Sequence, residues 1–185
     1  MNVRETALPG VLVIEPTIHG DDRGFFVETW HRDRYAEIGI DLSFVQDNHS
    51  RSQHGVLRGL HAQTGSSAQG KLVRVIAGSI YDVAVDARLG SPTYGQHVGV
   101  SLDARNKHQI WVPPGFLHGF CVTSEDGAEI EYKCTAPYDA AADLSVLWND
   151  PDIGISWPVN DPLLSDKDRD APRLAEVQDR LSPYA

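Results

Sequence analysis

Residues 108–135 read HQIWVPPGFLHGFCVTSEDGAEIEYKCT and contain three strand-like runs separated by turn signals. The runs are HQIWVP (108–113), GFLHGFCVT (115–123) and AEIEYKCT (128–135). β-Branched and aromatic residues are frequent in them, whereas Pro, Gly, Ser and Asp fill the gaps between them. The stretch therefore predicts consecutive short strands joined by tight turns.

The same pattern extends outward from this stretch. Seven further runs precede it: VLVIEP (11–16), GFFVETW (24–30), SFVQDNHS (43–50), GVLRGLH (55–61), KLVRVIAG (71–78), SIYDVAVDA (79–87) and QHVGVSL (96–102). Many short, closely spaced strands indicate a sandwich or a barrel. Helical pattern is limited to 31–39, which Gly39 would close, and to 170–181. We expect one domain over 1–185, with a short helical tail from about residue 169.

Composition places the chain among ordinary globular proteins. It has 185 residues, of which 41% are hydrophobic and 23% are charged, and its formal net charge of -10 argues against non-specific binding to nucleic acid. No run approaches the roughly 20 apolar residues of a membrane span, and MNVRETALPG (1–10) lacks an apolar export signal. Cys121 and Cys134 lie in strand-like segments; a disulfide between them is possible, but buried thiols in a reducing cytoplasm are expected.

Two segments resemble the paired sequence boxes of the cupin barrel. The second box, PxGxxH, corresponds to Pro-Pro-Gly-Phe-Leu-His at 113–118. The first box of metal-binding cupins begins G-x5-H-x-H, and Gly55 and His61 match its first two positions. The fold class expected is therefore all-β, a cupin-type jelly-roll barrel with short peripheral helices.

The metal ligands of the first box are replaced in this chain. Gln63 stands where the second histidine would be, and Lys71 follows where a carboxylate is expected. A charged ammonium has three donors and no lone pair, so it repels a cation. We therefore expect no metal and no cofactor, and a fixed positive charge that could stabilise an oxyanion.

Strand alternation predicts which side chains share a face. It groups His118 with two phenylalanines, Tyr132 with apolar neighbours on its strand, and Lys71 with two valines. Arg58 and His61 differ in parity and would point to opposite faces of a regular strand, although the glycine between them permits a bulge. A His, a Lys and a Tyr directed into one barrel would be costly as core and sensible as an active site.

Eight segments taken together resemble the dTDP-4-dehydrorhamnose 3,5-epimerase family, in the family's order and over about nine-tenths of the chain. They are DDRGFFVE (21–28), FVQDNHSRS (44–52), GVLRGLH (55–61), KLVRVIAG (71–78), VPPGFLHGF (112–120), EYKCTAPY (131–138), WNDPDIGISWP (148–158) and PLLSDKD (162–168). The resemblance implies epimerisation at C3 and C5 of a 4-keto-6-deoxyhexose linked to dTDP, in dTDP-L-rhamnose biosynthesis. Such chemistry needs a base, an acid on the other face of the sugar and a stabiliser for the enolate oxygen.

The resemblance also implies roles for individual residues. His61 would be the base, Asp168 its charge partner, Tyr132 the opposing acid, and Lys71 a neighbour of the enolate oxygen. Tyr138 would stack on thymine. The other residues implied in substrate binding are Arg23, Phe26, Glu28, Gln46, Asn48, Arg58, His118, Asp143 and Lys167, with Lys71 again. The family pattern further implies a homodimer in which an N-terminal segment reaches the neighbour's site.

Three alternatives remain open at the level of sequence. Some relatives of the family invert only C3 or only C5, and their catalytic residues are largely shared. Ala62 precedes Gln63 where an aromatic residue commonly stands, so a difference from the family's pocket wall is expected here. The other two alternatives, a metal-dependent cupin enzyme and a non-catalytic sugar-nucleotide binder, rank lower.

Overall fold

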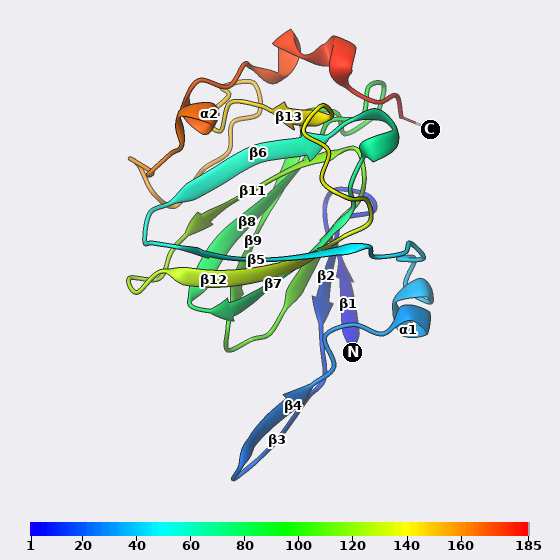
Figure 1. Cartoon of the computed structure of the whole chain (residues 1–185), viewed down its shortest axis with the longest axis vertical. Helices are drawn as coiled ribbons and strands as arrows, with labels where there is room; N and C mark the ends of the chain where they lie inside the picture. Colours follow the sequence, from blue (N-terminus) through cyan, green and yellow to red (C-terminus); the bar gives the residue numbers. More distant parts are fainter. Residues whose placement is uncertain (185) are drawn as a thin grey trace.

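Two antiparallel sheets face each other in the computed structural model, which describes residues 1–184 (Figure 1). The first sheet contains, in spatial order, β1 (Asn2–Glu5), β2 (Leu12–Glu15), β10 (Gln109–Val112), β7 (Lys71–Ala77), β12 (Ala128–Cys134) and β5 (Gln46–Ser52). The second contains β13 (Asp143–Ser145), β6 (Leu57–Gln63), β11 (Phe116–Val122), β8 (Ser79–Asp86) and β9 (His97–Asp103). The arrangement is the expected all-β jelly roll.

All ten runs expected to be strands form strands, and three further strands were not expected. The three are β1, β13 and β3 (Ile18–Asp21), which pairs with β4 (Gly24–Val27) in a separate hairpin. They are only three or four residues long and read NVRE, DLS and IHGD. Such short polar segments carry too little alternation to be recognised without their partners.

The main core fills the space between the sheets. Val13, Val73 and Ile110 from the first sheet pack with Phe116 and Phe120 from the second. Two smaller apolar clusters cover the outer faces, one beneath the C-terminal segment and one beneath the helix near residue 35. Because the second sheet is covered on both faces, every residue of its central strand β11 is buried.

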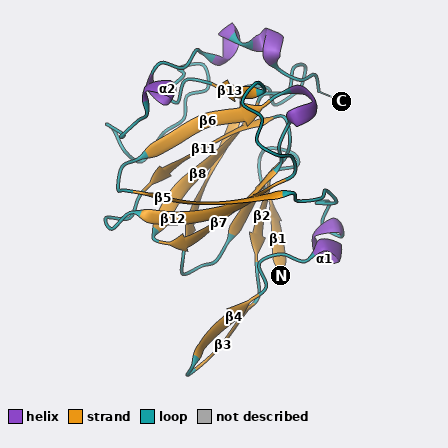
Figure 2. Ribbon diagram, in the orientation of Figure 1, coloured by secondary structure: helices purple, strands orange, loops and turns teal. Residues whose placement is uncertain are grey.

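Helices are short and peripheral (Figure 2). They comprise α1 (Arg32–Ala36), α2 (Asp166–Arg169) and the 3-10 turns η1 (Gly65–Ser67), η2 (Leu174–Glu176) and η3 (Gln178–Arg180). The helix expected over 31–39 is confirmed as α1, and Gly39 follows it with φ 89°.

The helix expected over 170–181 is wrong in kind, because this stretch forms the two turns η2 and η3. Tertiary hydrogen bonds compete with a continuous helix there. The Leu174 amide donates to the Asp150 carboxylate at 2.8 Å, and the Pro172 carbonyl accepts from the Leu147 amide at 2.8 Å. These two backbone groups therefore bond to the segment that follows β13 and not within a helix.

The β3–β4 hairpin projects away from the two sheets (Figure 1). Phe25 and Phe26 are 60% and 69% exposed on it, which is unusual for large apolar side chains. Cys121 and Cys134 are buried free thiols. None of the helices within residues 1–184 has the length and apolar character that crossing a bilayer requires.

Candidate active site

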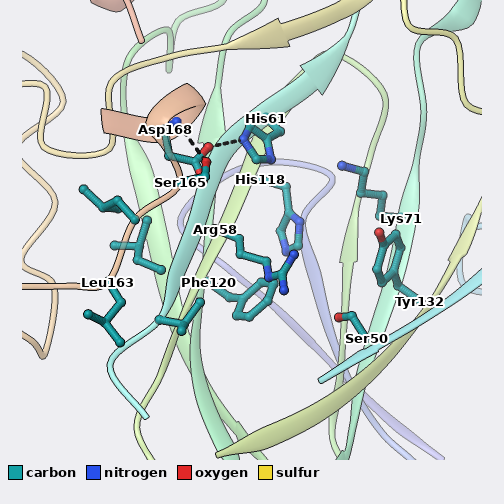
Figure 3. Close-up of a pocket in the computed structure, with 13 residues that line it drawn as sticks. Ser50, Arg58, His61, Lys71, His118, Phe120, Tyr132, Leu163, Ser165 and Asp168 are labelled. Atoms are coloured by element: carbon teal, nitrogen blue, oxygen red, sulfur yellow. Dashed lines mark hydrogen bonds and ion pairs between the residues drawn. The ribbon is translucent and has the colours of Figure 1, made fainter. Parts of the chain in front are cut away.

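A cavity of about 480 Å³ opens between the sheets, within the size range of small-molecule sites. Its polar lining includes Arg58 and His61 from β6, Lys71 from β7, His118 from β11 and Tyr132 from β12 (Figure 3). Leu163, Leu164, Ser165 and Asp168 form a further wall, together with Ser50, Val56, Leu57 and Phe120. The sheets thus bring together residues that are far apart in the chain.

A bulge in β6 explains how Arg58 and His61 reach the same cavity. His61 lies opposite His118 and Arg58 lies opposite Phe120, so two residues of β6 face one residue of β11. The register shift reverses the alternation between the two positions. The bulge that the sequence only permitted is present.

His61 and Asp168 form a direct pair although 107 residues separate them. Asp168 Oδ1 accepts from His61 Nε2 at 2.5 Å, and its Oδ2 accepts from the Ser165 hydroxyl at 2.9 Å. Burial acts to raise the pKa of Asp168, but the hydrogen bonds from His61 and Ser165 outweigh it and lower that pKa below its ordinary value. The carboxylate therefore remains ionised at neutral pH and orients the imidazole.

Ser165 was not anticipated from the sequence, although a signal for it exists. It caps the N-terminus of α2, because its side chain accepts from the Asp168 amide. A serine three residues before an acidic residue is a typical helix start. Ser165 thus both starts α2 and holds the Asp168 carboxylate in position.

His118 has a buried carboxylate partner that sequence reasoning missed. Its Nε2 lies 2.9 and 3.0 Å from the two oxygens of Asp82, which is fully buried on β8. An acidic residue inside the apolar run SIYDVAVDA was the available signal, since an unpaired carboxylate there would be costly. The cavity therefore has two His–Asp pairs.

Lys71 and Tyr132 stand on neighbouring strands of the first sheet. Tyr132 pairs with Val73, and Lys71 pairs with Cys134, so both side chains belong to one inward row. Burial lowers the pKa of Lys71, and burial raises the pKa of Tyr132. No hydrogen bond or ion pair joins the Lys71 ammonium to another residue of the described chain, which leaves its donors available to a ligand.

A second cavity of about 370 Å³ adjoins the first and shares His61, Lys71 and Tyr132 with it. Its other lining residues include five that were implied in substrate binding: Gln46, Asn48, Tyr138, Asp143 and Lys167. An ion pair joins Lys167 to Asp143. The two cavities form one cleft that holds most of the implied site residues.

Three implied binding residues lie outside this cleft within the single chain. Arg23 and Phe26 are on the projecting hairpin, where Arg23 pairs with Asp21. Glu28 follows the hairpin and pairs with Arg34 at 2.6 Å. One chain by itself does not bring them to His61.

The residues at the cupin ligand positions do not fit a metal. Lys71 offers an ammonium, and the Gln63 amide is bonded to backbone groups on both sides of it. Within residues 1–184, no three His, Cys, Asp or Glu side chains gather closely enough to hold a metal ion.

Comparison with known proteins connects this geometry to a family. The sequence profile described as "dTDP-4-dehydrorhamnose 3,5-epimerase" matches residues 5–176. A dTDP-4-dehydrorhamnose 3,5-epimerase from Salmonella typhimurium is 54% identical over 179 residues, which cover 96% of this chain and 97% of that protein. A dTDP-4-dehydrorhamnose 3-epimerase from Streptomyces niveus is 41% identical, with 100% of this chain and 90% of that protein covered.

Solved structures agree. The crystal structure of dTDP-6-deoxy-D-glucose-3,5-epimerase from Legionella pneumophila, in complex with dTDP-4-keto-L-rhamnose, has a TM-score of 0.96 and 49% identity to this chain. The match covers 100% of this chain and 98% of that one. Sequence and structure therefore agree over nearly the whole length. The chain belongs to the dTDP-4-dehydrorhamnose 3,5-epimerase family of isomerases.

Proposed function

We propose that this enzyme converts dTDP-4-dehydro-6-deoxy-D-glucose to dTDP-4-dehydro-L-rhamnose by inverting C3 and C5, in dTDP-L-rhamnose biosynthesis. The observation that carries the proposal is the His61–Asp168 pair on one side of the cleft and Tyr132 on the opposing sheet. The Legionella relative, whose structure contains dTDP-4-keto-L-rhamnose, supports the same substrate class.

His61 is the base in this mechanism. It removes the proton from a carbon beside the C4 keto group, and Asp168 stabilises the imidazolium that results. The negative charge of the enolate collects on the C4 oxygen. Lys71, whose ammonium has no partner within residues 1–184, is the donor that stabilises this oxygen, and His118 assists from β11 of the other sheet.

Tyr132 is the acid that returns a proton to the opposite face. Its raised pKa keeps the phenol protonated at neutral pH, as a proton donor requires. A proton removed on one face and returned on the other inverts the carbon. The same pair serves C3 and C5 in turn if the sugar ring presents each carbon between them.

The adjoining cavity is the proposed site of the nucleotide. Tyr138 is 62% exposed and offers a ring face to thymine. Lys167 in this cavity and Arg58 in the first cavity supply positive charge for the diphosphate, which would lie where the two cavities meet. Gln46 and Asn48 are polar neighbours, and Asp143 holds Lys167. Local positive charge can thus bind an anion despite the acidic net charge of the chain.

The enzyme works as a homodimer in this proposal, and the β3–β4 hairpin of one subunit completes the site of the other. The exposed Phe25 and Phe26 support this, since a projecting apolar hairpin lacks cover in one chain. The hairpin would then deliver Arg23, Phe26 and Glu28. Coexpressing Arg23→Ala with His61→Ala tests it. A mixed dimer regains activity only if each site takes Arg23 from one subunit and His61 from the other, because one of its two sites then has both residues. Two inactive variants that stay inactive as a mixed dimer contradict the shared site.

Catalysis should be independent of metal. We expect turnover to survive exhaustive chelation and to be unchanged by added divalent cations, because Lys71 and Gln63 occupy the cupin ligand positions. Turnover of chelated enzyme, with and without each added metal, measures this. Activity that disappears on chelation and returns with one specific metal would contradict the prediction and favour a metal-dependent cupin enzyme.

Incubation with dTDP-4-keto-6-deoxyglucose in D2O, followed by NMR at C3 and C5, tests the function itself. Deuterium and inverted configuration at both carbons are expected. Inversion at a single carbon would instead support the reaction named for the Streptomyces niveus relative or its C5 counterpart. A protein that binds the substrate and exchanges no proton is a non-catalytic binder.

The two free buried thiols support a cytoplasmic location.

A further inference from the structure

Gln63 occupies the position of a cupin metal ligand but holds a loop. Its side chain is nearly buried, at 5% exposure. Nε2 donates to the carbonyls of Ser67 and Pro137 at 2.7 and 3.1 Å, and Oε1 accepts from the Asp139 amide at 2.8 Å. Both amide hydrogens and the carbonyl oxygen are therefore used, each on a backbone group.

Tyr138 lies between Pro137 and Asp139, two of the three loop residues that Gln63 contacts. Its own amide donates to Gln46 Oε1 at 2.8 Å, so two glutamines hold three consecutive residues of the backbone. The Tyr138 ring is 62% exposed. Packing against the ring therefore contributes little to its position, and the hydrogen-bonded backbone sets the direction in which it projects.

The rest of the loop is tied to the same region. The Ser67 hydroxyl donates to Asp139 Oδ2 at 2.8 Å, and Gln69 Nε2 donates to the Ala136 carbonyl at 2.7 Å. The segment from Ser67, at the end of η1, to Gln69 is thus linked through polar contacts to the segment that follows β12, and the buried Gln63 contacts both.

We propose that Gln63 is a positioning residue that preorganises Tyr138 as a stacking platform for the base of the nucleotide. The inference rests on the proposed function, because it assumes that a nucleotide occupies the adjoining cavity. Ordering a loop before a ligand arrives removes an entropic cost from binding. Gln63 should therefore affect nucleotide affinity, while the proton-transfer steps at His61 and Tyr132 proceed as before.

Gln63→Glu is the sharpest variant, because it keeps the length of the side chain and removes both donors. An ionised carboxylate only accepts hydrogen bonds, so it would face the carbonyl oxygens of Ser67 and Pro137 without a proton to share. We expect KM for the dTDP-linked substrate and Kd for dTDP to rise about tenfold, in keeping with loss of a buried hydrogen-bonded group. The expected change in kcat is less than about twofold.

The matched control is Gln53→Glu. It makes the same chemical change at an exposed position in the turn before β6, so it reports the effect of one added charge. KM and Kd should stay at wild-type values. If Gln63→Glu does not fold, Gln63→Met replaces it, since it keeps the length of the side chain without its polar atoms.

A double-mutant cycle identifies the route of the effect. Tyr138→Ala should raise Kd for dTDP, and Gln63→Glu should add less than about twofold in that background, because its target is gone. Fold-changes that multiply would mean that Gln63 acts elsewhere and would overturn the proposal. An unchanged Kd in Gln63→Glu alone, or a fall in kcat with KM constant, would overturn it as well.

Hydrogen exchange separates this inference from the proposed function. The amide of Tyr138, which donates to Gln46, should exchange faster in Gln63→Glu than in wild type, because the loop has lost both donors of Gln63. This readout requires neither substrate nor turnover. Unchanged exchange contradicts the positioning role even if the enzyme is an epimerase. If exchange is faster in Gln63→Glu but the wild-type protein does not epimerise the substrate, the role of Gln63 in holding the loop stands and only the proposed function is rejected.

Discussion

At the scale of single residues, the site depends on how each ionisable group is partnered. Asp168 is 3% exposed, yet His61 and Ser165 keep its pKa low. Its ionised form therefore stabilises the folded protein above the carboxyl pKa of the unfolded chain, and this contribution is lost as the pH falls through the lower pKa of the folded state. The pair is thus intact at neutral pH, as the proposed proton abstraction by His61 requires.

His61→Ala should leave a folded barrel with almost no turnover. A general base contributes about 10²- to 10⁴-fold in rate, and in the proposed mechanism His61 begins both inversions. Asp168→Asn should cost less, because the imidazole remains and only its partner is weakened. Steady-state kcat of the two folded variants measures this. A larger loss in Asp168→Asn than in His61→Ala would reverse the proposed roles.

Tyr132→Phe should separate proton exchange from inversion. The change keeps the ring and deletes its only acidic hydrogen, so stability should change little. His61 can still form the enolate and return the proton to its original face. We expect deuterium exchange from D2O to continue at one or both carbons while net inversion falls steeply.

One NMR time course on Tyr132→Phe and His61→Ala reads both outcomes, since His61→Ala should lose exchange and inversion together. Normal inversion by Tyr132→Phe would assign the acid to another group or to water. Complete loss of exchange in Tyr132→Phe would mean that the phenol acts earlier, on the enolate oxygen.

At the scale of elements, the bulge in β6 decides which side chains reach the cleft. Gly59 sits in it with φ 140°, a left-handed conformation that side chains other than glycine rarely adopt. An added Cβ would lie 2.6 Å from the Gly119 Cα of the facing strand. The bulge therefore requires glycine at both positions, and it is the bulge that places Arg58 and His61 on the same wall of the cleft.

Gly59→Ala should destabilise the fold by about 3 kcal/mol and remove most activity, because backbone atoms must move apart. Gly24→Ala is the matched control: it has nearly the same φ, 138°, but nothing lies within 4 Å of its added Cβ. Chemical denaturation of both variants isolates the cost of the close approach. Equal losses of stability would show that the backbone angle alone matters.

At the scale of the whole molecule, a buried carboxylate ties the C-terminal segment to the barrel. Asp86 accepts hydrogen bonds from Arg88, Ser91 and Thr93. The Arg88 guanidinium in turn lies over the rings of Phe116 and Tyr184, 4.3 and 4.8 Å from their centres. Burial acts to raise the pKa of Asp86, but these hydrogen bonds outweigh it and lower the pKa to about 2.

Asp86→Asn should lower the free energy of unfolding at pH 7 by about 2 kcal/mol, the equivalent of the pKa shift. Because the folded pKa lies below that of the unfolded chain, the ionised form stabilises the fold above about pH 4 and ceases to do so as the pH falls toward 2. Urea denaturation between pH 7 and pH 3 should therefore show the gap to wild type narrowing.

Asp161→Asn is the control for Asp86→Asn, since Asp161 is exposed and its side chain has no hydrogen-bond partner in the described part of the chain. It should match wild type throughout this pH range. A gap between Asp86→Asn and wild type that stays constant with pH would mean that packing of the side chain, and not its charge, stabilises this region.

The amino-acid sequence by itself determined the ten principal strands, the all-β class and the cupin positions of His61, Lys71 and His118. It could do so because apolar alternation, turn residues and motif spacing are properties of neighbouring residues. Alternation also grouped Lys71 and Tyr132 with inward-facing neighbours, as the pairing of β7 with β12 confirms.

Only the tertiary structure decided which distant groups meet. Strand register and the path of the C-terminal segment across the barrel decide four features of the site. These are the pairing of Asp82 with His118, the contact of Ser165 with Asp168, the β6 bulge and the loop held by Gln63. The same holds for the C-terminal turns, where the Leu174 amide donates to the Asp150 carboxylate and not to a carbonyl of its own helix. Such contacts join residues up to 107 positions apart, and their partners are chosen by packing and register, which local sequence pattern does not encode.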